Sequence, residues 1–465
     1  MRISGKGARY LAQNDFSKGK MSQNILSMAL PMTVAQLIHI LYNIVDRIYL
    51  GHIEGVGRLS ITGVGLCLPV ISIIMAFANL CGMGGAPLCS IYRGRGESEE
   101  AECVMGNAFT LILGFGALLT VGCLIFKGPI LYLFGASDAT FPYADDYLTI
   151  YLYGTLFVMA GLGMNAFINS QGFGRTGMFT VVIGAVLNLI LDPIFIFWLN
   201  MGVKGAALAT ILSQAVSALW VLRFLTGSKA ILRLRLSGMK LKASRVKKIL
   251  SLGVSSFVMA MTNSLVQSLC NATLQRTGGS MGDLYVGVMT VINSVREVIT
   301  MPITGITHGC QPVLGYNYGA KLYSRVREGI RITTAATLLY AVASWALVMA
   351  FPQFFIHIFN SEAELIEAGV PAFRLYFCTF FCMVGQMVGQ SVSVALGRSK
   401  TAVFFSLLRK AFIVAPLTVI LPALGWGVNG IFAAEPISNV IGGVACFAVM
   451  IFTVYIPMGR SEDGT

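Results

Sequence analysis

Long apolar segments follow one another along the whole chain, and short stretches rich in Gly, Pro, Lys and Arg separate them. A helix needs about 20 consecutive apolar residues to cross a membrane. We see no long alternation of polar and apolar residues of the kind that transmembrane β-strands require. The pattern predicts an all-α integral membrane protein with twelve transmembrane helices, at residues 24–51, 59–88, 102–126, 143–169, 177–199, 203–225, 248–275, 284–314, 329–352, 369–395, 401–423 and 428–456.

Composition points the same way. Of the 465 residues, 56% are apolar and 11% are charged, against about 45–50% and about 25% in soluble domains. A globule of this size with so little polar surface cannot face water, so we expect lipid around it. The ten cysteines lie in or beside apolar segments and are interpreted as small buried apolar residues. No His or Cys cluster predicts a metal centre, and we expect no cofactor.

The net charge of +13 would suit a nucleic-acid partner if the basic residues formed one patch. They concentrate instead in alternate loops, which excludes that interpretation. The positive-inside rule then predicts cytoplasmic N- and C-termini. Basic residues also precede the first helix without a small-residue cleavage site, so we expect a start anchor there: Arg2, Lys6, Arg9, Lys18 and Lys20. Only five basic residues fall on the predicted outer side: Arg47, Arg58, Lys127, Lys204 and Arg276.

One long basic loop divides the chain. The predicted organisation is an N-terminal six-helix bundle (1–225), a basic cytoplasmic linker (226–247) and a C-terminal six-helix bundle (248–465). We expect the basic face of the linker to rest on anionic lipid headgroups.

The two halves repeat each other. Ile25-Leu26-Ser27 returns as Ile249-Leu250-Ser251, and Gly174-Arg175 as Gly397-Arg398, with an offset that stays between 223 and 225 residues. A repeat of six helices is parallel and is related by an axis along the membrane normal. The sequence therefore predicts two pseudo-symmetric bundles around a central cleft, the architecture of an alternating-access transporter.

Acidic residues inside membrane helices are costly and mark functional sites. At 1.5 Å per residue, Asp46, Asp192 and Thr210 all lie roughly 10 Å below the predicted outer face. Asn188 shares a helix face with Asp192 because the two are four residues apart. Together these side chains predict a site for a proton or a Na⁺ ion, since two carboxylates in contact cannot both stay ionised cheaply. The structural alternative is that the acids only tie helices together.

Other polar residues are more ambiguous. His39, Tyr42 and Asp46 form one stripe of the first helix, and His39 is either a proton relay or a hydrogen-bonded cavity residue. Glu297 either offers negative charge to a cationic substrate or forms a salt bridge between the two bundles. Glu435 either meets substrate or pairs with Arg409.

Several motifs together resemble the multidrug and toxic compound extrusion family, in its MepA-like and DinF-like bacterial branches within the MOP flippase superfamily. They cover essentially residues 22–456 and comprise Asn43-Ile-Val-Asp46-Arg-Ile-Tyr-Leu-Gly51 with Pro31 upstream, Arg93-Gly94-Arg-Gly96 running to Gly106-Asn107, Asn188-Leu-Ile-Leu-Asp192-Pro, and Gln311-Pro312-Val-Leu-Gly315-Tyr-Asn317-Tyr-Gly319.

The resemblance implies a secondary active antiporter, not an enzyme, that exports lipophilic or cationic drugs and toxic organic cations in exchange for H⁺ or Na⁺. It implies a coupling site at Asp46, Asn188, Asp192 and Thr210, and a bend at Pro31 when that site is protonated. It also implies that Tyr42 and Asn165 line the cavity. Other branches place essential acids in helices 7 and 10, and this chain has none there. A bacterial inner membrane and function as a monomer are expected.

Two other classes of protein are alternatives to the antiporter. A flippase for a lipid-linked or amphipathic precursor would be expected to carry more cationic residues in its cavity. A non-transporting receptor or membrane enzyme is disfavoured by the repeat and by the lack of a catalytic set. Gly172-Phe-Gly174-Arg-Thr-Gly177 spells GxGxxG but joins two membrane helices, so it predicts a tight turn and not a nucleotide site.

Overall fold

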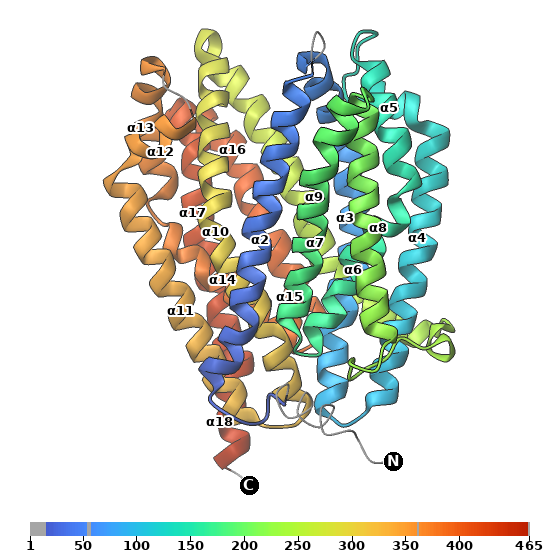
Figure 1. The fold of residues 1–465 in the computed structure, drawn as a ribbon. Coiled ribbons are helices and arrows are strands. Elements are labelled where there is room, and N and C mark those ends of the chain that lie inside the picture. The colour runs from blue at the N-terminus through green and yellow to red at the C-terminus, as the bar shows by residue number, and fades with distance from the viewer. Residues whose placement is uncertain (1–14, 54–56, 360–361, 464–465) are drawn as a thin grey trace. The chain divides into compact units, whose positions relative to one another are not determined.

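The computed structural model describes residues 15–53, 57–359 and 362–463. The predicted basic residues Arg2, Lys6 and Arg9 lie outside them. Within these ranges the regular structure is helical, with no strand. The chain separates into two compact units, and Figure 1 follows their elements in chain order from blue to red.

The first unit contains described residues 15–18 and Leu30–Gly253. Its elements are most of α2 (Met21–Gly51), α3 (Gly57–Gly94), α4 (Ser98–Leu133), α5 (Phe141–Tyr153), α6 (Thr155–Ser170), α7 (Gly174–Pro193), the π-helix η1 (Ile194–Trp198), α8 (Val203–Thr226), the 3₁₀-helix η2 (Leu236–Met239) and the start of α9 (Ala243–Gly278).

The second unit contains Gly19–Ala29 and the described chain from Val254 onward. Besides the start of α2 and the rest of α9, it holds η3 (Gly279–Met281), α10 (Gly282–Gly319), α11 (Tyr323–Ala350), α12 (Pro352–Phe359), α13 (Ala363–Phe377), η4 (Phe380–Cys382), α14 (Met383–Ala395), α15 (Ser399–Leu407), η5 (Leu408–Val414), α16 (Ala415–Leu421), η6 (Pro422–Trp426), α17 (Gly427–Met450), η7 (Ile451–Tyr455) and α18 (Ile456–Asp463).

In the described part of the chain, nine helical stretches are long and apolar enough to cross a membrane, and the bent pair α5 and α6 makes a tenth. Two of the ten, Ala243–Gly319 and Ser399–Arg460, have 77 and 62 residues, far more than one crossing of a membrane needs. α9 and α10 line one cavity, and η5 meets α17 through Arg409 and Glu435. The stretches therefore contain twelve passes, and each overlaps one predicted span.

Two of the predicted spans are not single straight helices. The span at 143–169 breaks at Gly154, where α5 and α6 meet at an angle of 58°. A Cβ on Gly154 would lie 2.5 Å from the side chain of Ile211, so the glycine allows α8 to pack closely against the bend. The span at 369–395 is interrupted by η4, and the short helix α12 before it was not predicted.

The chain passes between the two units within helices and not within loops. α2 belongs to the second unit up to Ala29 and to the first from Leu30, next to Pro31. α9 belongs to the first unit up to Gly253 and to the second from Val254. The predicted domain limits of 1–225, 226–247 and 248–465 stay a prediction.

Both crossing helices pack closely at the point where they change unit. A Cβ on Gly253 would lie 1.8 Å from the carbonyl oxygen of Leu80 in α3. In the second unit, a Cβ on Gly309 of α10 would lie 2.5 Å from the Cα of Ala29. Small residues allow this backbone-to-backbone packing, which is common between membrane helices.

The basic segment 226–247 folds onto α4. The side-chain amide of Asn107 donates to the carbonyl oxygens of Gly238 and Lys240, at 2.9 and 3.0 Å. Its carbonyl oxygen accepts from the backbone N–H of Lys242 at 2.9 Å. One buried side chain thus satisfies three backbone groups of a segment that has little regular structure.

Acidic residues at the start of α4 hold the same segment. Arg235 lies 3.1 Å from Glu102, and Arg245 forms a two-pronged contact with Glu100 at 2.9 and 2.6 Å. The predicted contact of this segment with lipid headgroups stays a prediction, and part of its positive charge is already paired with protein.

Candidate functional site

A buried polar cluster joins α7 and α8 in the first unit. Asn188 donates from its side-chain amide to Asp192 at 3.2 Å and to the hydroxyl of Thr210 at 3.4 Å. The exposed fractions are 2% for Asn188, 1% for Asp192 and 5% for Thr210. The i, i+4 spacing on α7 places the amide directly beside the carboxyl group, as the sequence predicts.

Helix α2 brings two further residues to this cluster. The side chains of Asp46 and Asp192 lie close enough to interact with each other, and so do those of Tyr42 and Thr210. The Oδ1 atom of Asp46 is buried and has no hydrogen-bond partner among the described residues. The structure therefore brings together all four predicted coupling residues, with an acceptor oxygen still available.

This arrangement can hold one small cation. Two carboxyl groups in contact repel each other when both are ionised, and a proton or a Na⁺ ion removes that repulsion. Carboxylate, amide and hydroxyl oxygens are the ligands that hard cations prefer. Among the described residues no group of three His, Cys, Asp or Glu side chains is placed to bind a metal ion.

The remaining predicted residues of the first unit lie in different surroundings. The His39 ring packs edge-on against Tyr42, with ring centroids 5.8 Å apart and planes at 67°. Asn165 of α6 donates to the carbonyl of Gly177 in α7 at 3.2 Å. Pro31 lies within α2, where that helix changes unit. His39 therefore adjoins the cluster, whereas Asn165 ties two helices together.

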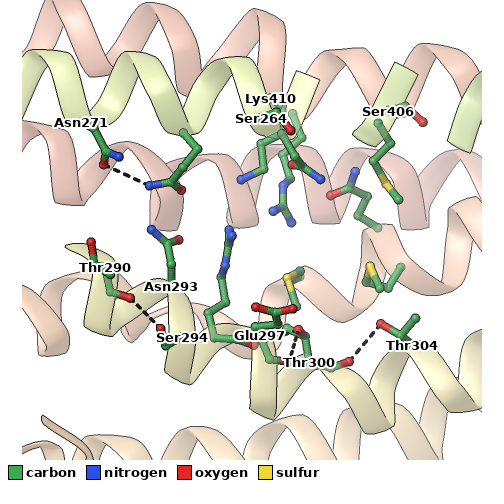
Figure 2. Close-up of a pocket in the computed structure, with 18 residues that line it drawn as sticks. Ser264, Asn271, Thr290, Asn293, Ser294, Glu297, Thr300, Thr304, Ser406 and Lys410 are labelled. Carbon is green, nitrogen blue, oxygen red and sulfur yellow. Dashed lines mark hydrogen bonds between the residues drawn. The ribbon is translucent and has the colours of Figure 1, made fainter. Parts of the chain in front are cut away.

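A large polar cavity lies in the second unit. Its volume is about 710 Å³, and Figure 2 shows it between side chains of α9 and α10, with Ser406 and Lys410 on the wall beside them. Of the 18 residues that line it, only Met259, Met383 and Met387 are apolar. Such a lining is unusual in a protein with 56% apolar residues, and it suits a ligand with polar groups.

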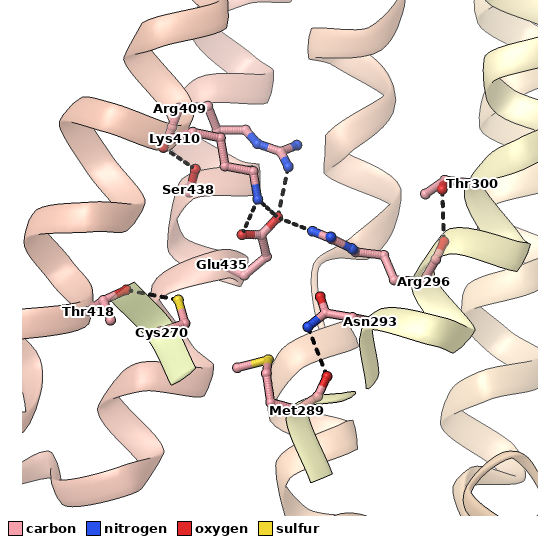
Figure 3. A network of polar contacts seen from close by, with 10 residues as sticks. All are labelled: Cys270, Met289, Asn293, Arg296, Thr300, Arg409, Lys410, Thr418, Glu435 and Ser438. Carbon is pink, nitrogen blue, oxygen red and sulfur yellow. Dashed lines mark hydrogen bonds and ion pairs between the residues drawn. The ribbon is translucent and has the colours of Figure 1, made fainter. Parts of the chain in front are cut away.

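Glu435 of α17 lies beside this cavity and contacts three cationic side chains (Figure 3). One carboxylate oxygen lies 2.7 Å from Arg409 and 3.6 Å from Arg296. Lys410 donates to both oxygens, at 3.0 and 2.9 Å. The predicted pairing alternative for Glu435 is therefore present as a contact, and two of its three partners were not foreseen.

The sequence contained a signal for this network. Arg409 and Lys410 are adjacent charges inside a predicted span, and in the structure both lie in the π-helix η5, a feature often found at functional sites. Glu297 lines the cavity and is exposed. No ion pair of Glu297 is found among the described residues, and both alternatives for it, contact with a cationic substrate and an inter-bundle salt bridge, stay predictions.

The model of the MatE family matches residues 31–194 and 259–420, one stretch in each half of the predicted repeat. The chain belongs to the MatE family. Members of the MatE family are transporters and not enzymes, and this chain is accordingly a multi-pass membrane protein of the multidrug and toxic compound extrusion type.

Relatives cover almost the whole of this MatE protein. The multidrug export protein MepA of Staphylococcus haemolyticus (strain JCSC1435) is 23% identical over 442 residues, which is 95% of this chain and 94% of MepA. MepA of Staphylococcus aureus (strain NCTC 8325 / PS 47) is 22% identical over 435 residues, 94% of each chain.

Solved structures share the MatE fold. An outward-facing multidrug resistance MATE family transporter of the MOP superfamily matches with a TM-score of 0.88 and 22% identity, over 99% of this chain and 100% of that one. A MATE in the bent conformation matches with a TM-score of 0.90 and 22% identity, over 99% of this chain and 100% of that one. A MOP superfamily transporter from Pyrococcus furiosus matches with a TM-score of 0.87 and 23% identity, over 97% of this chain and 99% of that one. That protein is described as having a binding pocket of reverse polarity, which suggests a different function. These likenesses establish the twelve-helix fold.

Proposed function

We propose that this MatE protein is a secondary active multidrug exporter that exchanges small molecules for H⁺ or Na⁺ by alternating access. The observation that carries the proposal is the contact between Asp46 and Asp192 beside Asn188 and Thr210 in the first unit. A cation that binds there changes the charge between α2 and α7. It can drive transport only if it binds one conformation more tightly than the other.

The exported molecules are proposed to be drugs or toxic organic cations, by analogy with the multidrug export proteins that the chain resembles. We place the protein in the bacterial cytoplasmic membrane with both termini inside, as the distribution of Lys and Arg predicts. One chain contains both halves of the repeat, so we propose that a monomer transports.

The test is efflux of a fluorescent lipophilic cation from proteoliposomes under an imposed pH or Na⁺ gradient. Wild type is compared with Asp46→Asn and Asp192→Asn, and Asp138→Asn, an exposed acid between α4 and α5, is the matched control. We expect gradient-driven efflux in wild type and the control and its loss in both variants. Efflux that survives in both variants would refute the coupling site, and the gradient that works identifies the ion.

A flippase for a lipid-linked or amphipathic precursor is the second candidate. The three cations around Glu435 favour it, because a phosphate headgroup needs cationic partners. Wild-type protein that is folded but inert under every gradient, and that moves a fluorescent phospholipid between leaflets, would favour this candidate over the antiporter.

A further inference from the structure

The charges around Glu435 do not balance. Within 3.6 Å of its carboxylate lie the cationic groups of Arg296, Arg409 and Lys410. Arg409, Lys410 and Glu435 are only 6%, 7% and 5% exposed. Buried charge without a counter-charge is costly in a membrane protein, and a single carboxylate cannot neutralise three cations. The set lacks negative charge.

Arg296 is the cation with the most unused capacity. Its 3.6 Å contact with Glu435 is the longest of the three, and its side chain is 26% exposed while those of Arg409 and Lys410 are 8% and 9%. A guanidinium carries five N–H donors in a planar fork that matches a carboxylate or a phosphate. Since Arg296 also lines the 710 Å³ cavity, its free donors are accessible to a ligand there.

A second, independent observation lies behind Arg296. The Nε atom of Arg409 is buried and has no hydrogen-bond partner among the described residues, although Arg409 lines the same cavity. A buried donor left without a partner costs about 1–3 kcal/mol. An anionic group that entered the cavity would supply the missing charge beside this donor.

A negatively charged side chain also lines the cavity. Glu297 follows Arg296 on α10 and is exposed where it lines the cavity. A ligand that carries both a cationic and an anionic group could therefore meet a matching charge for each. Figure 2 shows Glu297 among hydroxyl and amide side chains of α10, where Asn293 and Thr300 lie within about one helical turn of it.

We propose that the cavity of the second unit binds zwitterionic substrates, with Arg296 as the contact for their carboxylate or phosphate group and Glu297 facing their cationic group. This inference rests on the proposed export function, because it names the class of molecule that enters the transporter. It differs from the lipophilic cation expected from the sequence by adding an anionic group to the substrate.

The test is equilibrium binding of rhodamine B and its ethyl ester to the purified full-length protein, without any ion gradient. The two dyes share one cationic ring system and differ only in whether the carboxylate is free. A charge-assisted hydrogen bond contributes about 1.5–3 kcal/mol, so we expect wild type to bind rhodamine B at least about tenfold more tightly than the ester.

Arg296→Gln should reduce that preference to within about twofold, while Arg374→Gln, an exposed arginine of α13 outside the cavity, should keep it. Glu297→Gln should weaken binding of both dyes and leave the preference for the free carboxylate intact. This variant keeps the test decisive if Arg296→Gln does not fold. Equal binding of the two dyes by wild type, or an unchanged preference in Arg296→Gln, would overturn the proposal.

Competition identifies the source of the anionic group. If dihexanoyl phosphatidic acid displaces rhodamine B at a much lower concentration than inorganic phosphate, the site favours a lipid headgroup. If both compete equally, it favours a free anion. If neither compound displaces rhodamine B, the proposed anion site is overturned. Because no gradient is used, a protein that prefers rhodamine B but shows no ion-driven efflux would keep this inference and lose the antiporter.

Discussion

Lys410 donates from its ammonium group to both carboxylate oxygens of Glu435, at 3.0 and 2.9 Å. This two-oxygen contact joins η5 to α17, and Arg409 adds a third bond between the same two elements. Ser438, one turn after Glu435, donates to the backbone carbonyl of Arg409 at 3.1 Å. The network is therefore part of how the last two passes of the second unit pack.

Replacing Glu435 by Gln should lower the stability of the second unit strongly. The change removes the one acid that three cations share, and breaking a buried ion pair from one side costs about 3–5 kcal/mol. Thermal unfolding of the purified protein should show a clear fall in Tm. Glu297→Gln makes the same chemical change at an exposed position on the cavity wall and should leave Tm nearly unchanged. Equal Tm values for the two variants would contradict a structural role for the network.

Replacing Asn188 by Ala should weaken ion coupling without abolishing the fold. The amide is the donor that links Asp192 to Thr210, and a buried acceptor left unsatisfied costs about 1–3 kcal/mol. We expect the ion concentration for half-maximal efflux to change by about tenfold. Asn200→Ala, at an exposed position beyond η1, should leave it unchanged. An Asn188→Ala protein with a wild-type ion response would exclude the amide from the site.

Replacing Asn107 by Ala should release the segment 226–247 from α4. Three backbone groups lose their hydrogen bonds to one side chain, which corresponds to roughly 2–3 kcal/mol. Trypsin should then cleave at Lys240 or Lys242 several-fold faster than in wild type. Glu99→Ala, an exposed change in the first turn of the same helix, should leave the cleavage rate unchanged, and faster cleavage in both variants would point to general loosening of α4.

Replacing Gly253 by Ala should disturb the packing of α9 on α3. The new methyl group would lie 1.8 Å from the carbonyl oxygen of Leu80, so one backbone must shift, at a cost of roughly 1–3 kcal/mol. Gly114→Ala is the matched control because nothing lies within 4 Å of the added atom, and alanine favours a helix by up to about 1 kcal/mol. Tm should fall in the first variant and stay or rise in the second.

Much of the fold follows from local sequence. Apolar length predicted all twelve passes, and the depth of Asp46, Asp192 and Thr210 in their helices predicted that these residues meet. Depth succeeds because membrane helices cross a slab of known thickness, so that residues at one level are limited to a thin layer. The roles of these residues stay predictions.

What the sequence did not predict depends on contacts between distant helices. Nothing near Glu435 in the chain indicates that Lys410 and Arg296 reach it, because their convergence depends on how three helices pack. The close contact of Gly154 with Ile211 of α8 is similar, since it joins residues that are far apart in the chain. Packing between distant helices decides such details, and the pattern of apolar residues along the chain does not predict that packing.

Because α2 and α9 each belong to both compact units, neither half of the polypeptide contains a complete unit. Each half of the polypeptide lends the first turns of its leading helix to the compact unit built mainly by the other half. The exchange points, after Ala29 and after Gly253, are related by the repeat offset. A chain divided in the segment 226–247 would thus give two fragments, neither of which carries a whole unit. Such fragments should be recovered intact only when both are synthesised in one cell, as with subunits that swap an element.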